Sequence, residues 1–387
     1  MINQIKRFFE IAREIGLRDA LTTTKSYLLF ELPDSFFWTP LTRYIYSKYE
    51  KIDRSELREQ AEITIKTETE FIPFKSIEGV PCREDQGFYR PGDRFVAAVD
   101  NAEIKGKKGF VTSSNNNIVS EAIGPPNIQP RRNLLSLNHA LKELNFSFNK
   151  PAENNIRLAS SLIVFAGNAY YHWTVEQLSK IFMLQKYGEK KGEYPDLLVR
   201  KDRASFIDES LEIIDYPGNV RYWSGGSKQI NTLVVPSYPD QTKEELEWVR
   251  DRMISNSKNL DIGKEKILVT RQDAETRRIE NFEEVKQELT KLGFETITPG
   301  KHTVEEQVNI FKDAEIIVGV HGAGLTNIIY SENAEVIELV GENKNHATFS
   351  RISNVLGHNY SRIKCETNNR NLEINIDDIE NIVSEKI

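Results

Sequence analysis

Two glycines follow a short apolar run late in the chain, within His321-Gly322-Ala323-Gly324. Glycine lets backbone amides approach a ligand closely. A helix is predicted to begin here, and its unbonded N–H groups and positive dipole end would point at the same place. Such a terminus suits a phosphate group. Gly-x-Gly spacing also occurs in tight packing turns, so both interpretations stay open at this point.

Arginines follow another apolar run, Ile267-Leu268-Val269, which is predicted to be a strand. Arg271 stands at the end of this run, and Arg277 and Arg278 come shortly after it. A guanidinium binds phosphate oxygens through two parallel hydrogen bonds and keeps its charge. We therefore expect Arg271 above all to face the same crevice as the glycine turn. The alternative for each arginine is a surface ion pair with a nearby carboxylate such as Asp273.

Three further residues have side chains suited to acid–base or hydrogen-bond chemistry. His172 and Glu176 are four residues apart, which places them on one face of a helix. Either residue could deprotonate a hydroxyl group while the other orients it. The alternative is a structural His–Glu pair, and no third ligand is spaced to complete a zinc site. Glu338 ends another predicted strand, where it is either an acceptor for ribose hydroxyls or a solvated strand end.

The last third of the chain alternates between strands and helices. Strands are predicted at 267–270, 294–297, 315–320 and 335–339. Two helices between them begin with capping-box patterns, Asn281 with Glu284 and Thr303 with Glu306. This alternation predicts a doubly wound α/β domain. Its candidate residues would lie at the carboxyl ends of the strands, where open α/β sheets bind ligands.

The rest of the chain divides into two parts that differ in their pattern of apolar and polar residues. Residues 1–60 predict a helical N-terminal extension, which either packs on the main body or touches a membrane surface through residues 1–30. Residues 61–240 predict an N-terminal domain, with a β-rich insertion over 61–150 and buried parallel strands from 156 onward. The C-terminal domain is placed at 241–387.

Composition narrows the classes of function. The chain has 387 residues and a net charge of −7, which argues against a nucleic-acid partner. Its two cysteines, Cys82 and Cys365, do not suggest a disulfide framework. No apolar run is long enough to span a membrane. We expect a cytoplasmic protein, with peripheral attachment at the inner membrane face as the alternative.

Three segments together resemble glycosyltransferase family 61. They are Asn168-Ala-Tyr-Tyr-His-Trp-Thr-Val-Glu-Gln-Leu, Leu268-Val-Thr-Arg-Gln-Asp-Ala-Glu-Thr-Arg-Arg, and Glu306-Gln307 through Val318-Gly-Val-His-Gly-Ala-Gly-Leu-Thr-Asn to Val336-Ile-Glu-Leu. The resemblance covers roughly residues 95–345. It implies a GT-B fold, in which two Rossmann-like domains face a cleft, and an inverting transfer of sugar from a nucleotide-sugar.

The resemblance also implies roles for the candidate residues. His172 and Glu176 would be the catalytic pair on the acceptor side. The donor would bind through Arg271, Arg277, Arg278, Glu338 and the turn with its following amides, which comprises His321, Gly322, Ala323, Gly324, Leu325, Thr326 and Asn327. Thr174 and Gln177 depart from the commonest family form, which leaves the acceptor open among glycan, lipid-linked and protein-linked hydroxyls.

No cofactor or metal is expected, because the chain contains no Asp-x-Asp sequence of the kind that often carries a divalent ion in single-domain glycosyltransferases. Two alternatives remain at this stage. One is a sugar-nucleotide epimerase of similar fold, which would need no acceptor. The other is a catalytically inactive scaffold that binds a glycan.

Overall fold

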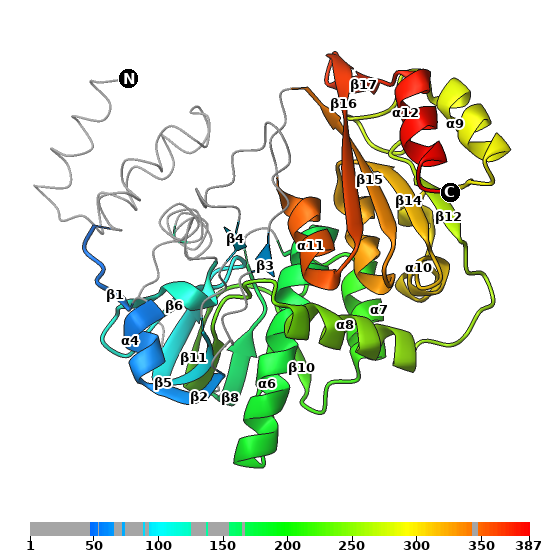
Figure 1. Ribbon diagram of the computed structural model, residues 1–387. Helices are drawn as coiled ribbons and strands as arrows, with labels where there is room; N and C mark the ends of the chain where they lie inside the picture. The colour runs from blue at the N-terminus through cyan, green and yellow to red at the C-terminus, as the bar shows by residue number, and fades with distance from the viewer. Residues whose placement is uncertain are drawn as a thin grey trace, which may run out of the picture.

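The computed structural model describes residues 47–52, 54–65, 72–73, 88–89, 93–124, 137, 155–164, 167–342 and 347–387. These residues form a mixed α/β structure with two large sheets and a small two-stranded one (Figure 1). Most of the predicted helical extension, including the membrane-contact hypothesis for residues 1–30, lies outside the described residues. Within the described residues, no helix is long and apolar enough to cross a membrane.

The first sheet has nine strands, and two long antiparallel strands form its centre, β5 (Arg94–Lys105) and β11 (Ser227–Pro236). On one side of β11 the sheet continues in parallel through β8 (Ile156–Ser161), β9 (Asp196–Arg200) and β10 (Val220–Trp223). On the other side lie β6 (Phe110–Thr112), β7 (Ile118–Val119), β1 (Lys51–Ile52) and β2 (Ala61–Ile65), and β3 (Ile72–Pro73) and β4 (Phe88–Tyr89) pair separately. The strands β2, β5 and β6 fall within the segment that the sequence predicts to be β-rich, residues 61–150.

Helices cover the parallel half of the first sheet. They are α6 (Leu178–Lys191), α7 (Ser205–Ile214) and α8 (Lys243–Asn256), and the short α4 (Arg54–Glu59) packs near β5. The turn before α6, His172–Gln177, is a π-helix that we label η3. The sequence predicts an ordinary helix there, so the widened turn is a finding of the structure. Wide turns of this kind often occur at functional sites.

The second sheet has six strands in the order β13-β12-β14-β15-β16-β17. The strands are β12 (Lys266–Val269), β13 (Glu295–Ile297), β14 (Ile316–Val320), β15 (Glu335–Gly341), β16 (Asn359–Asn368) and β17 (Asn371–Glu373). All neighbours are parallel except β16 and β17. Because the chain moves outward from β12 in both directions, the strand order reverses between β12 and β14. Open α/β sheets bind ligands at such a switch point.

Helices cover both faces of the second sheet. α9 (Phe282–Lys291) and α12 (Ile376–Ser384) lie together on one face (Figure 1). The other face carries α10 (Val304–Phe311), η5 (Ala323–Tyr330) and α11 (Thr348–Leu356), all of which contact α8. Side chains alternate accordingly along β12, where Leu268 faces α9 while Ile267 and Val269 join the core beneath α8.

The predicted helix starts have different outcomes. The Thr303 capping box is confirmed, since the Glu306 N–H donates to Thr303 Oγ1 at 3.2 Å and the Thr303 N–H to Glu306 Oε2 at 2.8 Å. The Asn281 capping box is wrong. The Asn281 side chain instead pairs with the backbone of Ile374, at 2.8 and 3.1 Å, and ties α9 to the C-terminal segment. The helix expected after Gly322 forms as a 3₁₀ helix, η5.

One hydrophobic core joins the two sheets. It contains Leu178 and Phe182 from α6 together with Val269, Ile317 and Phe349 from the second sheet and its helices. α8 lies in the middle and contacts α6 and α7 on one side and α10, α11 and η5 on the other. The two sheets therefore share an apolar layer of helices. The predicted boundary at residue 240 falls between β11 and α8.

Candidate active site

The glycine turn and Arg271 meet at the switch point of the second sheet. Arg271 follows β12 and Gly322 follows β14, and these two strands are neighbours. A Cβ atom added to Gly322 would lie 2.0 Å from Nη1 and 2.8 Å from Cζ of Arg271. The guanidinium therefore rests directly on the backbone of the turn, and only glycine leaves room for it. The structure thus brings Arg271 and the glycine turn into contact at the carboxyl ends of these two strands.

A cavity of about 320 Å³, which we call the interface cavity, lies beside this contact and takes its walls from both sheets. From the first sheet's helical layer come Tyr170, Phe206 and Glu209. From the second come Arg271, Ala323 and Gly324, with Asp273, His302 and Gln307 around them. The interface cavity is thus where groups of the two halves could meet one ligand.

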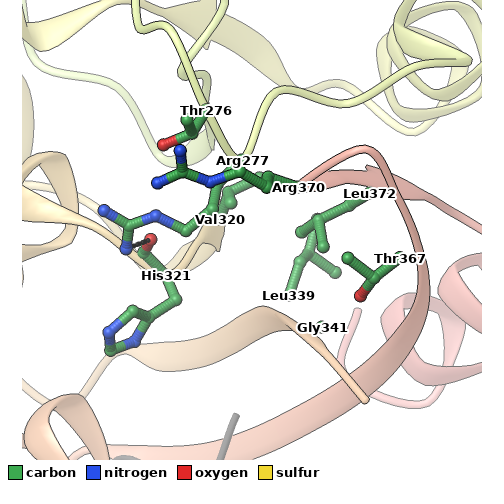
Figure 2. Close-up of a pocket in the computed structure, with 9 residues that line it drawn as sticks. All are labelled: Thr276, Arg277, Val320, His321, Leu339, Gly341, Thr367, Arg370 and Leu372. Atoms are coloured by element: carbon green, nitrogen blue, oxygen red, sulfur yellow. Dashed lines mark hydrogen bonds between the residues drawn. The ribbon is translucent and has the colours of Figure 1, made fainter. Parts of the chain in front are cut away.

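A second cavity of about 180 Å³ lies at the start of the turn, where Val320 and His321 line it (Figure 2). We call it the hairpin cavity, because Thr367, Arg370 and Leu372 of the β16–β17 hairpin line it. Arg277 and His321 also line it, and Arg277 Nη1 donates to the His321 carbonyl at 2.7 Å. The segment from Val320 to Gly324 therefore borders both cavities.

Burial and mutual repulsion act on the arginines of this region. Burial lowers the pKa of Arg271, the positive charge of Arg277 lowers it further, and Asp273 partly opposes both effects. Burial likewise lowers the pKa of Arg277, with a further contribution from Arg370. Arg271 forms no ion pair with another described residue, and its buried Nε has no hydrogen-bond partner among them. The surface ion pair with Asp273 is therefore not what the structure shows.

Glu338 lies beneath His321, not in either cavity. It is fully buried, so the interpretation as a solvated strand end is wrong. The His321 ring pairs with one of its oxygens through Nδ1, while the Tyr360 hydroxyl and Arg362 Nη2, the latter at 3.3 Å, donate to the other. Burial, followed by the charge of Glu338, raises the pKa of Tyr360. With its oxygens occupied by the protein, Glu338 orients His321 and has no surface for direct contact with ribose.

The other residues predicted to bind the donor are either buried beneath the turn or exposed away from the cavities. Leu325, Thr326 and Asn327 are fully buried under the turn. The Tyr170 hydroxyl donates to Asn327 Oδ1 at 2.7 Å, which ties the first half to the second. Burial raises the pKa of Tyr170 to about 12, so this donor stays protonated. Arg278 is exposed and lines neither cavity.

The predicted acid–base pair is found on η3. His172 Nδ1 lies 2.9 Å from Glu176 Oε2, although the ring is not oriented for a hydrogen bond. The Tyr238 hydroxyl donates to the same carboxylate oxygen. The side chain of His172 is 28 % exposed and that of Glu176 is 9 % exposed. His172 therefore has access to solvent, whereas Glu176 is held in the interior.

Aromatic rings connect this pair to the glycine turn. The Tyr171 ring packs edge-on against His172 at 5.3 Å and against Phe349 at 6.1 Å between centroids. Phe349 in turn packs against His321 at 5.4 Å. The candidate base on the first half and the turn on the second half thus border one aromatic cluster.

Sequence reasoning missed several residues around the cavities. Tyr170 lies in the segment that begins at Asn168 and resembles the family, and its hydroxyl group could have indicated a polar contact. Glu209 lies on α7, and one of its oxygens accepts the Val304 N–H at 2.7 Å, so only the packing of α7 against α10 reveals it. Arg370 and His302 have no sequence neighbours that suggest a site. Among the described residues, no group of three or more His, Cys, Asp or Glu side chains is arranged to hold a metal ion.

A comparison with known families gives an independent result. Residues 170–337 match the family model described as Glycosyltransferase 61. The match covers less than half of the chain, and it supports the assignment of this region to glycosyltransferase family 61. No curated protein matches the sequence at a significant level.

The matched region contains most of the geometry described above. It begins at Tyr170, so it includes His172 and Glu176, and it contains Arg271 and the whole glycine turn. It ends at residue 337, one position before Glu338, and leaves the β16–β17 hairpin with Arg370 outside. The family supports glycosyltransferase activity, and hence a sugar donor and an acceptor.

Proposed function

We propose that this protein is an inverting, metal-independent glycosyltransferase of family 61 and of the GT-B type. It would transfer a sugar from a nucleotide-sugar to a hydroxyl group of a glycan, lipid-linked or protein-linked acceptor during polysaccharide or glycoconjugate synthesis. In this proposal residues 61–240 serve the acceptor and residues 241–387 bind the donor, without a cofactor. The family match and the two-sheet architecture support it.

One observation carries the proposal, namely the position of Arg271 against Gly322 beside the interface cavity. The guanidinium, the glycine backbone and the start of η5 converge at the carboxyl ends of β12 and β14. A diphosphate needs positive charge and N–H donors at one place. The unpartnered Nε of Arg271 is a buried donor that such a ligand would satisfy.

The proposed reaction uses His172 as the base. The acceptor oxygen forms a bond to the anomeric carbon while the bond from that carbon to the diphosphate oxygen breaks. The acceptor proton moves to His172, and the bonding electron pair leaves with the nucleoside diphosphate. We assign the proton to His172 because Glu176 is more buried and already accepts the Tyr238 hydroxyl. Glu176 then stabilises the positive charge that forms on His172.

Arg271 and the backbone of the turn stabilise the negative charge that develops on the leaving diphosphate. Charge stabilisation of this kind is usually the largest contribution to catalysis. By analogy with the loss of one such donor, Arg271→Ala lowers the turnover rate by roughly 10²–10³-fold.

The test is calorimetric binding of UDP, GDP, CMP and their sugar conjugates to the wild type, Arg271→Ala and Lys286→Ala. Lys286 is an exposed cation on α9, outside both cavities, so its loss changes the net charge equally. We expect one nucleotide to bind the wild type and Lys286→Ala but not Arg271→Ala. Equal binding by all three proteins would refute the placement of the donor. Conversion of the donor alone into an epimer would refute the transferase assignment.

A further inference from the structure

Three arginines form a row along the edge where the strands of the second sheet end. Arg271 and Arg277 belong to the loop after β12, and Arg370 belongs to the turn between β16 and β17. Each affects the next, since Arg277 lowers the pKa of Arg271 and Arg370 lowers that of Arg277. None of the three forms an ion pair with a described residue. A cationic row of this kind attracts an anion.

The backbone holds Arg277 and Arg370 next to each other. The Arg277 N–H donates to the Arg370 carbonyl at 2.8 Å. Both residues have left-handed backbone conformations, with φ of 60° and 72°, which are uncommon for residues other than glycine. Figure 2 shows both guanidinium groups directed to the same side of the hairpin cavity. The fold thus keeps two like charges together in a strained conformation, as is frequent at functional sites.

The two cavities differ in charge. The hairpin cavity is lined by Arg277 and Arg370, and none of the described residues that line it is a carboxylate. The interface cavity is lined by Arg271 together with the carboxylates Glu209 and Asp273. Carboxylates accept hydrogen bonds from hydroxyl groups and repel phosphates. The interface cavity therefore suits an uncharged, hydroxyl-rich sugar, and the hairpin cavity suits a phosphate-bearing group.

The apolar residues of the hairpin cavity indicate that it could hold a nucleoside as well as a phosphate. Val320, Leu339 and Leu372 give it an apolar surface, and the hydroxyls of Thr276 and Thr367 lie at its edges (Figure 2). A flat ring with polar edges, attached to a phosphate, matches both features. With about 180 Å³, the cavity is smaller than most sites for small molecules, which span roughly 300–1,000 Å³. A larger ligand would therefore continue across the turn into the interface cavity.

We propose that Arg277 and Arg370 bind the nucleoside phosphate end of the donor in the hairpin cavity, while an uncharged donor sugar occupies the interface cavity. The diphosphate then crosses the turn from His321 to Gly324 beside Arg271. This inference rests on the proposed function and adds Arg370 to the donor site. Arg370 lies outside the residues that match the family, so the family match alone does not assign it.

The test compares nucleotide binding by the wild type, Arg370→Asn and Lys364→Asn, with UDP, GDP, CMP and inorganic pyrophosphate as probes. Asparagine tolerates the left-handed conformation of residue 370. Lys364 is an exposed cation on β16 that lines neither cavity, so it is a matched control for charge. Thermal unfolding confirms that the variants fold as the wild type does.

We expect Arg370→Asn to bind the preferred nucleotide roughly 10- to 100-fold more weakly, as for the loss of a charge-assisted hydrogen bond. Lys364→Asn should stay within about twofold of the wild type, as a surface substitution away from the site. Nucleotide binding by Arg370→Asn that equals that of Lys364→Asn overturns the inference.

Arg271→Ala, measured in the same assay, distinguishes a failure of this inference from a failure of the proposed function. Weakened binding in both Arg271→Ala and Arg370→Asn supports the inference. Weakened binding in Arg271→Ala alone overturns the inference and leaves the proposed function standing. Unchanged binding in both variants, or a wild type that binds none of the probes, overturns the proposed function as well.

Discussion

The contact between Gly322 and Arg271 allows a test that leaves every charged group of the site in place. In Gly322→Ala, the new Cβ would lie 2.0 Å from Nη1 and 2.9 Å from Cδ of Arg271. Ordinary van der Waals contact requires about 3.5 Å, so the guanidinium must retreat by roughly 1.5 Å. The backbone itself imposes no penalty, because φ of Gly322 is 171°, an extended conformation open to any residue.

Donor–acceptor distances in N–H···O hydrogen bonds vary by only about 0.5 Å, so a displacement of roughly 1.5 Å breaks such a bond. A phosphate held by Arg271 would lose at least one charge-assisted hydrogen bond, with a net value of about 1.5–3 kcal/mol. We therefore expect nucleotide affinity to fall roughly 10- to 100-fold, measured by titration calorimetry. Stability should change little, because the end of a flexible side chain can move aside.

Gly319→Ala is the matched control for the added methyl group. Its Cβ would meet Leu325 Cδ2 at 2.7 Å and Val269 Cβ at 3.0 Å, which are core atoms. This variant should lose about 1–3 kcal/mol of unfolding free energy through overpacking. The two glycines thus separate an effect on binding from an effect on folding.

A double-mutant cycle decides whether the effect of Gly322→Ala acts through Arg271. If it does, Gly322→Ala adds nothing in an Arg271→Ala background, because the displaced group is already absent. Additive losses in the double variant would refute this reasoning, as would a Gly322→Ala protein with the nucleotide affinity of the wild type.

Two further predictions concern buried groups. Tyr238→Phe removes a hydrogen-bond donor from the Glu176 carboxylate and should lower the unfolding free energy, measured by urea titration, by about 1–3 kcal/mol. Tyr222 is 52 % exposed, so Tyr222→Phe is the control and should keep nearly the stability of the wild type in the same titration. A Tyr238→Phe protein as stable as the wild type would contradict that hydrogen bond. The pKa of His358 is lowered from 6.5 to about 4, mainly by burial; the hydrogen bond to the Ile328 carbonyl opposes this shift and the charge of Arg250 adds to it. His358 Nδ1 accepts the Ala334 N–H at 3.0 Å. The unfolded chain therefore binds a proton below pH 6.5 that the folded protein does not. About 3 kcal/mol of stability is lost as the pH falls from about 7 to 4. His358→Gln should lose less over that range, and an unchanged pH dependence in the variant would refute the assignment.

The sequence predicts the second sheet well because its signals are local. Each strand is a short apolar run, and the Thr303 capping box is contained in four residues. The turn at Gly322 and the cationic end of β12 are equally local, so their meeting follows once the strands are taken as parallel neighbours. Asn281 shows the limit of this reasoning. Its side chain has a distant partner, the backbone of Ile374, which no local pattern reveals.

The parts of the site that sequence could not predict depend on contacts between distant segments. Arg370 reaches the hairpin cavity only because β17 turns back against β16. Glu338 is buried because β16 supplies Tyr360 and Arg362 to its carboxylate. The π-helical turn of η3 is equally invisible, since the residues from His172 to Gln177 fit an ordinary helical pattern.

The shared core bears on how the two halves could work together. If the halves were separate bodies, the distance between His172 and the glycine turn would vary with each opening of the cleft. Here α8 packs against helices of both halves, and Tyr170 donates a hydrogen bond across to Asn327. Tyr171 and Phe349 fill the space between His172 and His321. A large hydrophobic interface of this kind opposes relative domain motion. We therefore expect the candidate base and the glycine turn to keep a nearly fixed separation. In that arrangement we expect the side chains of the cavities to move when a ligand enters, above all Arg271, Arg277 and Arg370, which form no ion pair with a described residue.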